Sequence, residues 1–203
     1  MYHIFKRLLD SASAFFLIVV TSPLILLIAA AVQLTMGWPV IFRHMLPGRH
    51  ENLFTSLKFR TMTNAYDCDG KMLSEKERTT RLGRFLRNWS LDELPQLWNV
   101  LRGDLSFIGP RPLFVRYLPY YTQEERRRHW VRPGLTGWAQ VQGNSVPFET
   151  MLEMDVWYVD HLSFWLDLKI VAVTVCRFRR KKVIDTDIPA LDELRARKIS
   201  HAI

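Results

Sequence analysis

Two adjacent carboxylates, Asp92 and Glu93, lie within SLDELPQLWNVLRGDLSFIGPRP, residues 90–112 of a strongly basic chain. Neighbouring residues of a helix point about 100° apart around its axis, so these two groups are not expected to share one proton and should have separate roles. Arginines close in the sequence should keep Asp92 ionised. An ionised aspartate is a competent nucleophile toward phosphorus, and this is the chemistry that the pattern favours. The arginines are Arg84, Arg87, Arg102 and Arg111.

Helix capping is the simpler explanation of the same residues. Ser90-x-x-Glu93 fits a capping box, and acidic residues are favoured in the first turn of a helix. Pro95 is comfortable only in a first turn, which moves the expected start of the helix to Leu91 or Asp92, with its end at residue 102. Asp92 would then lie at the positive end of the helix dipole, which favours its ionised form and suits a nearby phosphate.

Cationic residues that suit a phosphate accompany the carboxylates. Pro110 and Pro112 fix the backbone on both sides of Arg111, whose guanidinium matches phosphate bidentately. A Mg²⁺ ion takes one or two carboxylates together with phosphate oxygens, which makes Asp92 the candidate metal ligand. The pattern therefore suggests Mg²⁺-assisted phosphoryl chemistry. Further cationic candidates are Lys58, Arg60 and Arg132, although any one of them is more often a surface charge than a ligand.

The composition suits one domain with its own core and a polyanionic partner. The chain has 203 residues, 48% of them hydrophobic, and a formal net charge of +8. Nucleic acid, an anionic membrane surface or a phosphorylated substrate would each match this charge. Cys68 and Cys176 form no C-x-x-C motif, and the six histidines show no metal-ligand spacing. A zinc site and a disulfide framework are therefore not expected.

Residues 12–34 form an uncharged apolar run that would reach about 35 Å as one helix, enough to cross a hydrocarbon core of about 30 Å. Ser22-Pro23 lies in its middle, so the helix should kink or break there, and the Ser22 hydroxyl should satisfy a freed carbonyl. Basic residues flank both ends, which predicts that both ends are cytoplasmic. A helix-break-helix that enters one leaflet and returns fits best; a simple span and a signal peptide remain alternatives.

The other elements must position these groups. Strands are expected near 40–43 and 54–60, joined by a Pro-Gly turn, followed by a polar loop over 65–80. Helices are expected over 80–89, with Leu82, Phe85 and Leu86 on one face, then over 91–102, 120–130 and 147–163. The amphipathic run 164–182, with its basic end, fits either a membrane-interface helix or a core helix. The class is α+β, mostly helical with a short β-hairpin: membrane helix 1–36, catalytic domain 37–185 and tail 186–203.

Four segments closely resemble the bacterial sugar transferases known as small monotopic phosphoglycosyl transferases. These are LKFRTM (57–62), residues 80–112, VRPGLTGWAQVQG (131–143) and DVWYVDHLSFWLDLKI (155–170). The resemblance implies a ping-pong reaction in which Asp92 attacks the β-phosphate of a UDP-sugar, UMP leaves, and polyprenyl phosphate accepts the sugar phosphate. It also implies Glu93 as the partner of Asp92, Mg²⁺ as cofactor, and a re-entrant helix broken at Ser22-Pro23 in the bacterial inner membrane, with the catalytic domain on the cytoplasmic face.

The matched motifs also suggest substrate-binding residues, and one segment departs from the family pattern. The expected partners are a UDP-sugar, undecaprenyl phosphate and membrane phospholipids, but not nucleic acid; a homodimer stays open, as does the glycan that the product feeds. Competing hypotheses are a membrane-bound Mg²⁺-dependent nucleotide-sugar phosphodiesterase and a basic membrane adaptor. FRHMLPG places His44 and Leu46 where relatives commonly carry Gln and Arg. The substrate-binding candidates are Lys58, Arg60, Arg87, Pro110, Arg111, Arg132 and Gln140.

Overall fold

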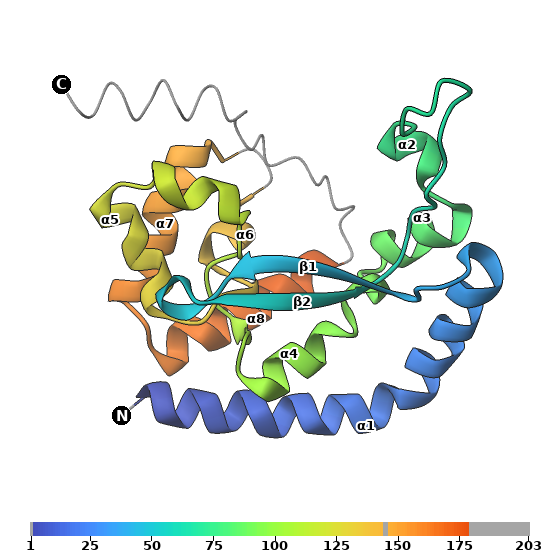
Figure 1. The fold of residues 1–203 in the computed structure, drawn as a ribbon. Coiled ribbons are helices and arrows are strands. Elements are labelled where there is room, and N and C mark those ends of the chain that lie inside the picture. The colour runs from blue at the N-terminus through green and yellow to red at the C-terminus, as the bar shows by residue number, and fades with distance from the viewer. Residues whose placement is uncertain (1, 144–145, 179–203) are drawn as a thin grey trace.

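A computed structural model describes residues 2–143 and 146–178, and it is mostly helical with two small sheets (Figure 1). One sheet is the antiparallel hairpin of β1 (Ile41–Pro47) and β2 (Leu53–Phe59), and the other pairs β3 (Ser106–Ile108) in parallel with β4 (Gly134–Thr136). The predicted fold class, mostly helical with a short hairpin, is confirmed. The basic cluster 179–182 and the tail 186–203 lie outside the described residues.

The N-terminal apolar run forms one continuous helix, α1 (Tyr2–Met36), with Pro23 inside it. The predicted break is therefore wrong. Proline cannot donate to the carbonyl of Val19, and the Ser22 hydroxyl donates to that carbonyl instead at 2.8 Å, as expected. The helix bends rather than ends, and Figure 1 shows its last turns rising away from the direction of its first part. Within the described residues α1 is the one helix long and apolar enough to cross a membrane.

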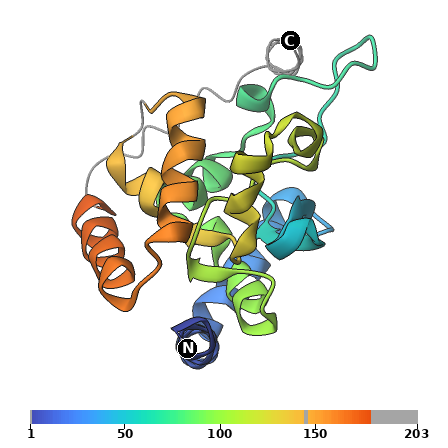
Figure 2. The same cartoon turned by 90° about the vertical axis from the view of Figure 1, so that its left-hand side faces the viewer.

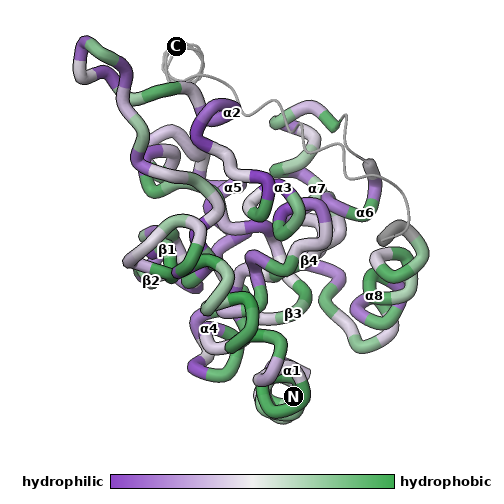
Figure 3. The backbone as a smooth tube through the Cα atoms, turned by 90° about the vertical axis from the view of Figure 1, so that its right-hand side faces the viewer, coloured by the Kyte–Doolittle hydropathy of each residue, from purple (hydrophilic) through white to green (hydrophobic). Residues whose placement is uncertain are grey.

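Both parts of α1 contact the rest of the molecule. In its first part the Arg7 guanidinium donates to the carbonyls of Val100 and Leu101, at 2.7 and 2.8 Å, near the end of α4 (Gln96–Arg102). In its second part Ile28 and Val32 pack in a buried apolar cluster with residues of other elements. The other members are Val40, Phe59 and Leu86. Seen end on in Figure 3, α1 is predominantly hydrophobic, whereas α2 (Glu75–Arg78) is hydrophilic.

The hairpin forms where the sequence predicts it, but β1 extends to Pro47, beyond the predicted end near residue 43. Ile41 lies opposite Phe59 and Pro47 opposite Leu53, so the two strands are in register along their full length. The 3₁₀ turn η1 (Arg49–Glu51) joins them. At this tip the Glu51 carboxylate accepts two hydrogen bonds from Nη1 of Arg126, at 2.6 and 2.7 Å. The tip is thereby fixed to the opposite part of the domain.

The expected helices form, but two of them are divided. The run 91–102 begins with the 3₁₀ turn η2 (Leu91–Glu93), and α4 starts only at Gln96, because Pro95 has no N–H to donate. The run 120–130 divides into α5 (Gln123–Arg126) and the 3₁₀ turn η4 (Arg127–Trp130), and the 3₁₀ turn η3 (Val115–Tyr120) precedes it. The remaining helices are α3 (Arg81–Asn88), α6 (Trp138–Gln142), α7 (Phe148–Asp160) and α8 (Phe164–Phe178).

The predicted apolar face of α3 is correct only in part. Leu86 is buried and Leu82 packs against the same cluster, but Phe85 is 52% exposed. The face toward the core is narrow because α3 lies very close to the chain at Thr61. A Cβ atom on Gly83 would come within 1.9 Å of the Thr61 carbonyl oxygen, so only glycine fits there.

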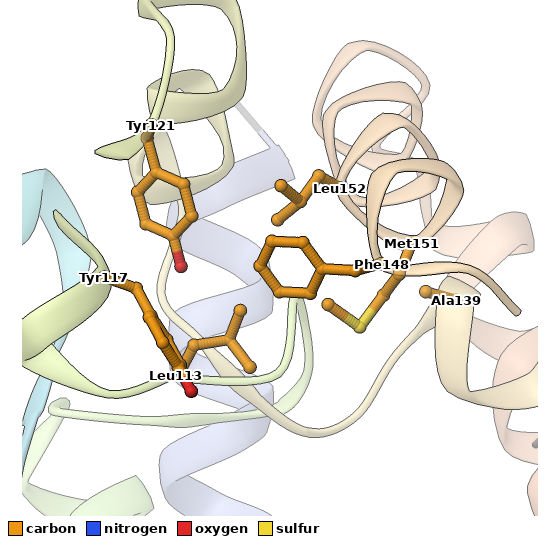
Figure 4. Packing of buried hydrophobic residues seen from close by; sticks show 7 residues of the cluster. All are labelled: Leu113, Tyr117, Tyr121, Ala139, Phe148, Met151 and Leu152. Carbon is orange, nitrogen blue, oxygen red and sulfur yellow. The ribbon is translucent and has the colours of Figure 1, made fainter. Parts of the chain in front are cut away.

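A second core lies between α7 and the segment that follows residue 112. Figure 2 shows α7 and α8 on one side of the molecule and the hairpin on the other, above the N-terminal part of α1. In Figure 4 the side chains of Leu113, Tyr121 and Leu152 gather around the ring of Phe148. This cluster anchors the chain directly after the Pro-Arg-Pro tripeptide. Its other buried members are Tyr117, Ala139 and Met151.

Candidate active site

Asp92 lies on the short turn η2, which packs against an apolar cluster shared by α1, β2 and α3. The turn begins after Ser90, which has a left-handed backbone conformation (φ 54°, ψ 22°). The Ser90 side chain makes no capping hydrogen bond to the turn, so the capping-box explanation does not hold there. Leu91 and Leu94 pack against the cluster that contains Ile28 of α1. Asp92, between the two leucines in sequence, is itself buried, at 9% exposure. The candidate nucleophile therefore lies on a turn that packs against the same apolar cluster as α1.

Glu93 has a different environment from Asp92. Its Oε1 accepts a hydrogen bond from Nζ of Lys58 on β2 at 2.8 Å, and both side chains are about one third exposed. The structure therefore brings the KFRTM segment and the carboxylate pair together. Because the two carboxylates differ in burial and in partners, their environments suit the separate roles that their adjacency suggests.

Two buried amides fix the carboxylate turn to the hairpin. Asn99, fully buried on α4, donates to the Thr55 carbonyl at 2.8 Å and accepts from the Leu57 N–H at 3.0 Å, much as a neighbouring strand would. Gln96 donates to Oγ of Ser56 at 3.3 Å. Sequence reasoning missed both residues. The available signal was their i, i+3 spacing on an otherwise apolar helix face.

Arg87 and Arg60 make contacts within the fold. Nε of Arg87 donates to the Thr61 hydroxyl at 3.0 Å. The Arg60 guanidinium donates to three backbone carbonyls, and two of them belong to Met36 and Trp38, at the end of α1 and just beyond it. Arg60 therefore caps the C-terminal end of α1. Its predicted contact with a phosphate stays a prediction.

The Pro-Arg-Pro segment has a fixed backbone and an exposed arginine. The Pro110 carbonyl accepts from the Gly134 N–H at 2.9 Å, and the Arg111 carbonyl accepts from Nη2 of Arg128 at 2.7 Å. Pro110 is buried, whereas the Arg111 side chain is exposed. This arrangement presents a guanidinium from a rigid backbone, which suits an anionic ligand.

Arg132 and Gln140 lie on the segments around β4. Nε of Arg132 donates to the Gly103 carbonyl at 2.8 Å, and burial, with the charges of Arg7 and Arg49, lowers the pKa of Arg132. Gln140 donates to the Leu135 carbonyl at 3.5 Å, and among the described residues its buried Oε1 has no hydrogen-bond partner. A buried acceptor without a partner is uncommon and is consistent with a ligand-binding role.

His44 and Leu46 both lie on β1. The His44 ring packs against Phe114 and Phe42, with centroid distances of 5.4 and 6.0 Å. Burial, followed by the charges of Lys58 and Arg116, lowers the pKa of His44, so its imidazole is neutral at pH 7. The departure from the family pattern therefore places an uncharged ring close to Lys58.

A metal ion would need ligands from its substrate. Among residues 2–143 and 146–178 no cluster of three or more histidine, cysteine or acidic side chains is arranged to hold one. Mg²⁺ commonly binds proteins through one or two carboxylates while substrate phosphates and water complete its shell. Asp92 beside Glu93 fits that limited requirement and does not fit a structural metal centre.

A second group of buried charges, which sequence reasoning also missed, joins α8 to the start of α1. Asp167 accepts hydrogen bonds from Nζ of Lys6 at 2.7 Å and from the hydroxyls of Tyr2 and Tyr158, at 2.6 and 2.7 Å. Asp10, buried on α1, accepts from the Phe107 N–H at 3.4 Å. The signal was an acidic residue within each apolar helix, because such residues are rarely buried without partners.

Comparison with known proteins gives one consistent result. The sequence model of the bacterial sugar transferase family matches residues 1–181. The uncharacterized sugar transferase EpsL of Bacillus subtilis is 48% identical over 198 residues, which are 97% of this chain and 96% of that protein. The UDP-glucose:undecaprenyl-phosphate glucose-1-phosphate transferase of Klebsiella pneumoniae is 40% identical over 183 residues, and the undecaprenyl-phosphate galactose phosphotransferase of Salmonella typhimurium is 36% identical over 187. The matches cover 85% and 83% of this chain but only 39% of each of those two proteins.

Proposed function

Because this chain belongs to the bacterial sugar transferase family, we propose that it transfers a sugar phosphate from a UDP-sugar to polyprenyl phosphate and releases UMP. Relatives named for this transfer onto undecaprenyl phosphate support the reaction class. The observation that carries the proposal is the position of Asp92. It lies on a turn that packs against an apolar cluster shared with the apolar helix α1, and it is joined through Glu93 to Lys58. A water-soluble donor and a lipid acceptor would meet at such a place.

The first step forms a covalent intermediate on Asp92. A carboxylate oxygen bonds to the β-phosphorus of the donor, the bond from that phosphorus to the bridging oxygen breaks, and UMP leaves with the electron pair. Lys58 and Arg111 place positive charge where negative charge develops on the phosphate oxygens. Mg²⁺, when bound, supplies further charge neutralisation at these oxygens.

The second step returns Asp92 to its starting state. A phosphate oxygen of polyprenyl phosphate bonds to the same phosphorus, the bond to the Asp92 oxygen breaks, and polyprenyl diphosphate-sugar leaves. Glu93, hydrogen-bonded to Lys58, is the group placed to assist proton transfer or the metal site in this step. The product would serve bacterial glycoconjugate assembly, such as O-antigen, capsule, exopolysaccharide or glycoprotein.

We further propose that α1 is re-entrant, with both ends at the cytoplasmic face of the inner membrane. Both ends are bonded to the same domain: Lys6 to Asp167 near the start, and the Met36 carbonyl to Arg60 at the end. A helix with its ends on opposite sides of a bilayer would not make both contacts with one domain on one side. Basic residues before and after the apolar run support the cytoplasmic side.

The start of α1 and α8 together form an apolar surface that suits the lipid interface. Phe5 on α1 packs edge to face against Phe164 of α8, at 6.3 Å between ring centroids, and both are exposed to the surroundings. Trp165, next along α8, is 75% exposed. Aromatic side chains are favoured at membrane–water interfaces, so this surface supports the interfacial placement of α8.

Release of UMP from a panel of UDP-sugars, with and without polyprenyl phosphate, tests the proposal. A transferase releases UMP repeatedly only when the acceptor is present, and Asp92→Asn abolishes that release. Continuous donor hydrolysis without the acceptor would instead indicate the phosphodiesterase. No release with any donor, together with salt-sensitive binding to anionic vesicles alone, would indicate an adaptor. A cysteine near residue 3 that reacts only from the cytoplasmic side supports the re-entrant path, and labelling from the other side rejects it.

A further inference from the structure

Arg128 is a fully buried cation whose guanidinium bonds in three directions. Its exposure is 2%, and Nε and Nη2 donate to Oδ2 of Asp155 at 3.1 and 2.6 Å. Nη1 lies 3.4 Å from the Tyr121 hydroxyl, and Nη2 also donates to the Arg111 carbonyl at 2.7 Å. Asp155, on α7, is equally buried at 2% exposure.

Stability alone is a poor reason for such a pair. Withdrawing two charges from water costs about as much as their attraction returns, and apolar residues of similar volume often serve the fold equally well. The surroundings here are already apolar, because Leu152 and Phe148 of α7 pack beside Tyr121 in the cluster of Figure 4. A function for the pair is therefore best sought in the remaining group that Arg128 holds, which is the backbone of Arg111.

The Arg111 peptide lies between two neighbours that are each anchored to the rest of the domain. Gly134 holds the carbonyl of Pro110 on one side, and Leu113 is anchored in the core on the other. Between these two anchors the Arg111 carbonyl accepts a hydrogen bond from a group that reaches out from the interior. The planar fork of Arg128 does so while two of its nitrogens remain on Asp155.

We infer that Arg128, oriented by Asp155 and Tyr121, is a positioning residue that sets the direction of the Arg111 side chain for donor binding. The inference rests on the proposed function, in which Arg111 contacts the phosphates of the UDP-sugar. Arg128 itself is buried and touches no substrate. It acts by fixing the peptide from which the exposed guanidinium projects, so that the backbone there need not be ordered when the donor binds.

The test compares Arg128→Lys with Arg126→Lys. Lysine keeps the charge but lacks the planar guanidinium, so it cannot hold Asp155 through two nitrogens, as Nε and Nη2 do, while one of them also bonds to the Arg111 carbonyl. Arg126 is the matched control, since it also pairs with a carboxylate, Glu51, and also donates to a backbone carbonyl, that of Leu118 at 2.8 Å. We expect Arg128→Lys to raise the KM for the donor about tenfold with kcat changed less than about threefold, and Arg126→Lys to change KM less than about twofold.

A double-mutant cycle separates positioning from a structural role. In an Arg111→Ala background, Arg128→Lys should change the donor KM less than about twofold, because the side chain that it positions is gone. Equal effects of Arg128→Lys in both backgrounds would overturn the inference, and so would an unchanged KM in Arg111→Ala alone. If Arg128→Lys does not fold, Tyr121→Phe keeps the ring in the core and removes only the hydroxyl. It should raise KM about twofold, and no rise would count against the inference.

The same samples keep this inference distinct from the proposed function. Sugar phosphate trapped on Asp92 reports the nucleophile whatever happens to KM. If sugar phosphate is trapped on Asp92 but the KM effects of Arg128→Lys and Arg111→Ala are additive, the positioning role of Arg128 is rejected and the transferase reaction is retained. Absence of both adduct and UMP release in the unmodified protein rejects the proposed function itself. The inference about Arg128, which depends on that function, is then rejected as well.

Discussion

The carboxylate turn and the Pro-Arg-Pro segment are both held rigidly, but by different means. The turn that carries Asp92 is seated on an apolar cluster shared with α1, and it is joined to β2 by neighbours that lie close in the sequence of α4. The segment that carries Arg111 is held by a buried ion pair whose members, Arg128 and Asp155, come from η4 and α7. The carboxylate turn is thus placed by apolar packing and by amide hydrogen bonds from residues near it in sequence, and the Pro-Arg-Pro segment by a polar network between residues far apart in sequence.

The largest effect is expected from removing the amide that joins the turn to the hairpin. Asn99→Leu would remove two part-buried hydrogen bonds and leave the Thr55 carbonyl and the Leu57 N–H without this partner, at about 1–3 kcal/mol each. A total loss of about 4 kcal/mol should lower the midpoint of thermal unfolding in detergent by roughly 8–16 °C. Asn88→Ala, at the exposed end of α3, is the control and should shift it little. Equal shifts would show that the turn does not depend on this amide.

The second effect uses pH to probe the polar network. Burial, followed by the charge of Arg128, lowers the pKa of the neighbouring His129 to about 4, against about 6.5 in the unfolded chain. Above pH 6.5 both states are neutral at this residue. As the pH falls from 6.5 to 4, only the unfolded chain takes up the proton, so the folded state should lose about 3 kcal/mol. Between pH 6.5 and 4 the unfolding midpoint of the unmodified protein should therefore fall more steeply than that of His129→Leu. Parallel curves for the two proteins would contradict a lowered pKa of His129.

A smaller but more specific effect concerns the pair between Glu93 and Lys58. Glu93→Gln and Lys58→Met should each reduce kcat/KM about 100-fold, with the unfolding midpoint changed by only a few degrees because the pair is partly exposed. Since the two side chains act as one unit, the double variant should lose much less than the product of the two single losses. Multiplicative losses would mean that the two side chains act independently. The pair could then not be counted among the contacts that hold the carboxylate turn.

The sequence predicts the apolar part of this arrangement well. Strand alternation and the Pro-Gly turn indicate the hairpin, and Ser22 beside Pro23 indicates the replacement hydrogen bond that the structure contains. The same local reasoning fails where two local signals compete. It predicts a break at Pro23, but the Ser22 hydroxyl compensates for the lost donor and the helix continues. It also extends α4 back to residue 91, where Pro95 permits only a 3₁₀ turn before the helix.

The polar network is beyond such reasoning because its partners are distant in sequence. Arg128 and Asp155 are 27 residues apart, and Lys6 and Asp167 are 161 apart. No periodicity links them, and Arg128, Asp155 and Lys6 each resemble an ordinary surface charge when taken alone. Among the site residues, Lys58 and Glu93 were named from motifs, and their contact is visible only in three dimensions. For Arg60 the motif predicts phosphate binding, whereas the structure shows a contact within the fold, the hydrogen bond that caps α1.

The central claim is that an oxygen of Asp92 becomes bonded to phosphorus. The most direct measurement is the intact mass and peptide map of the purified protein after incubation with Mg²⁺ and each of a panel of UDP-sugars, without acceptor. The account predicts a mass increase equal to one sugar phosphate on the peptide that contains Asp92, absent in Asp92→Asn and lost when polyprenyl phosphate is added. Full UMP release without such an adduct, or an adduct on another residue, would contradict it.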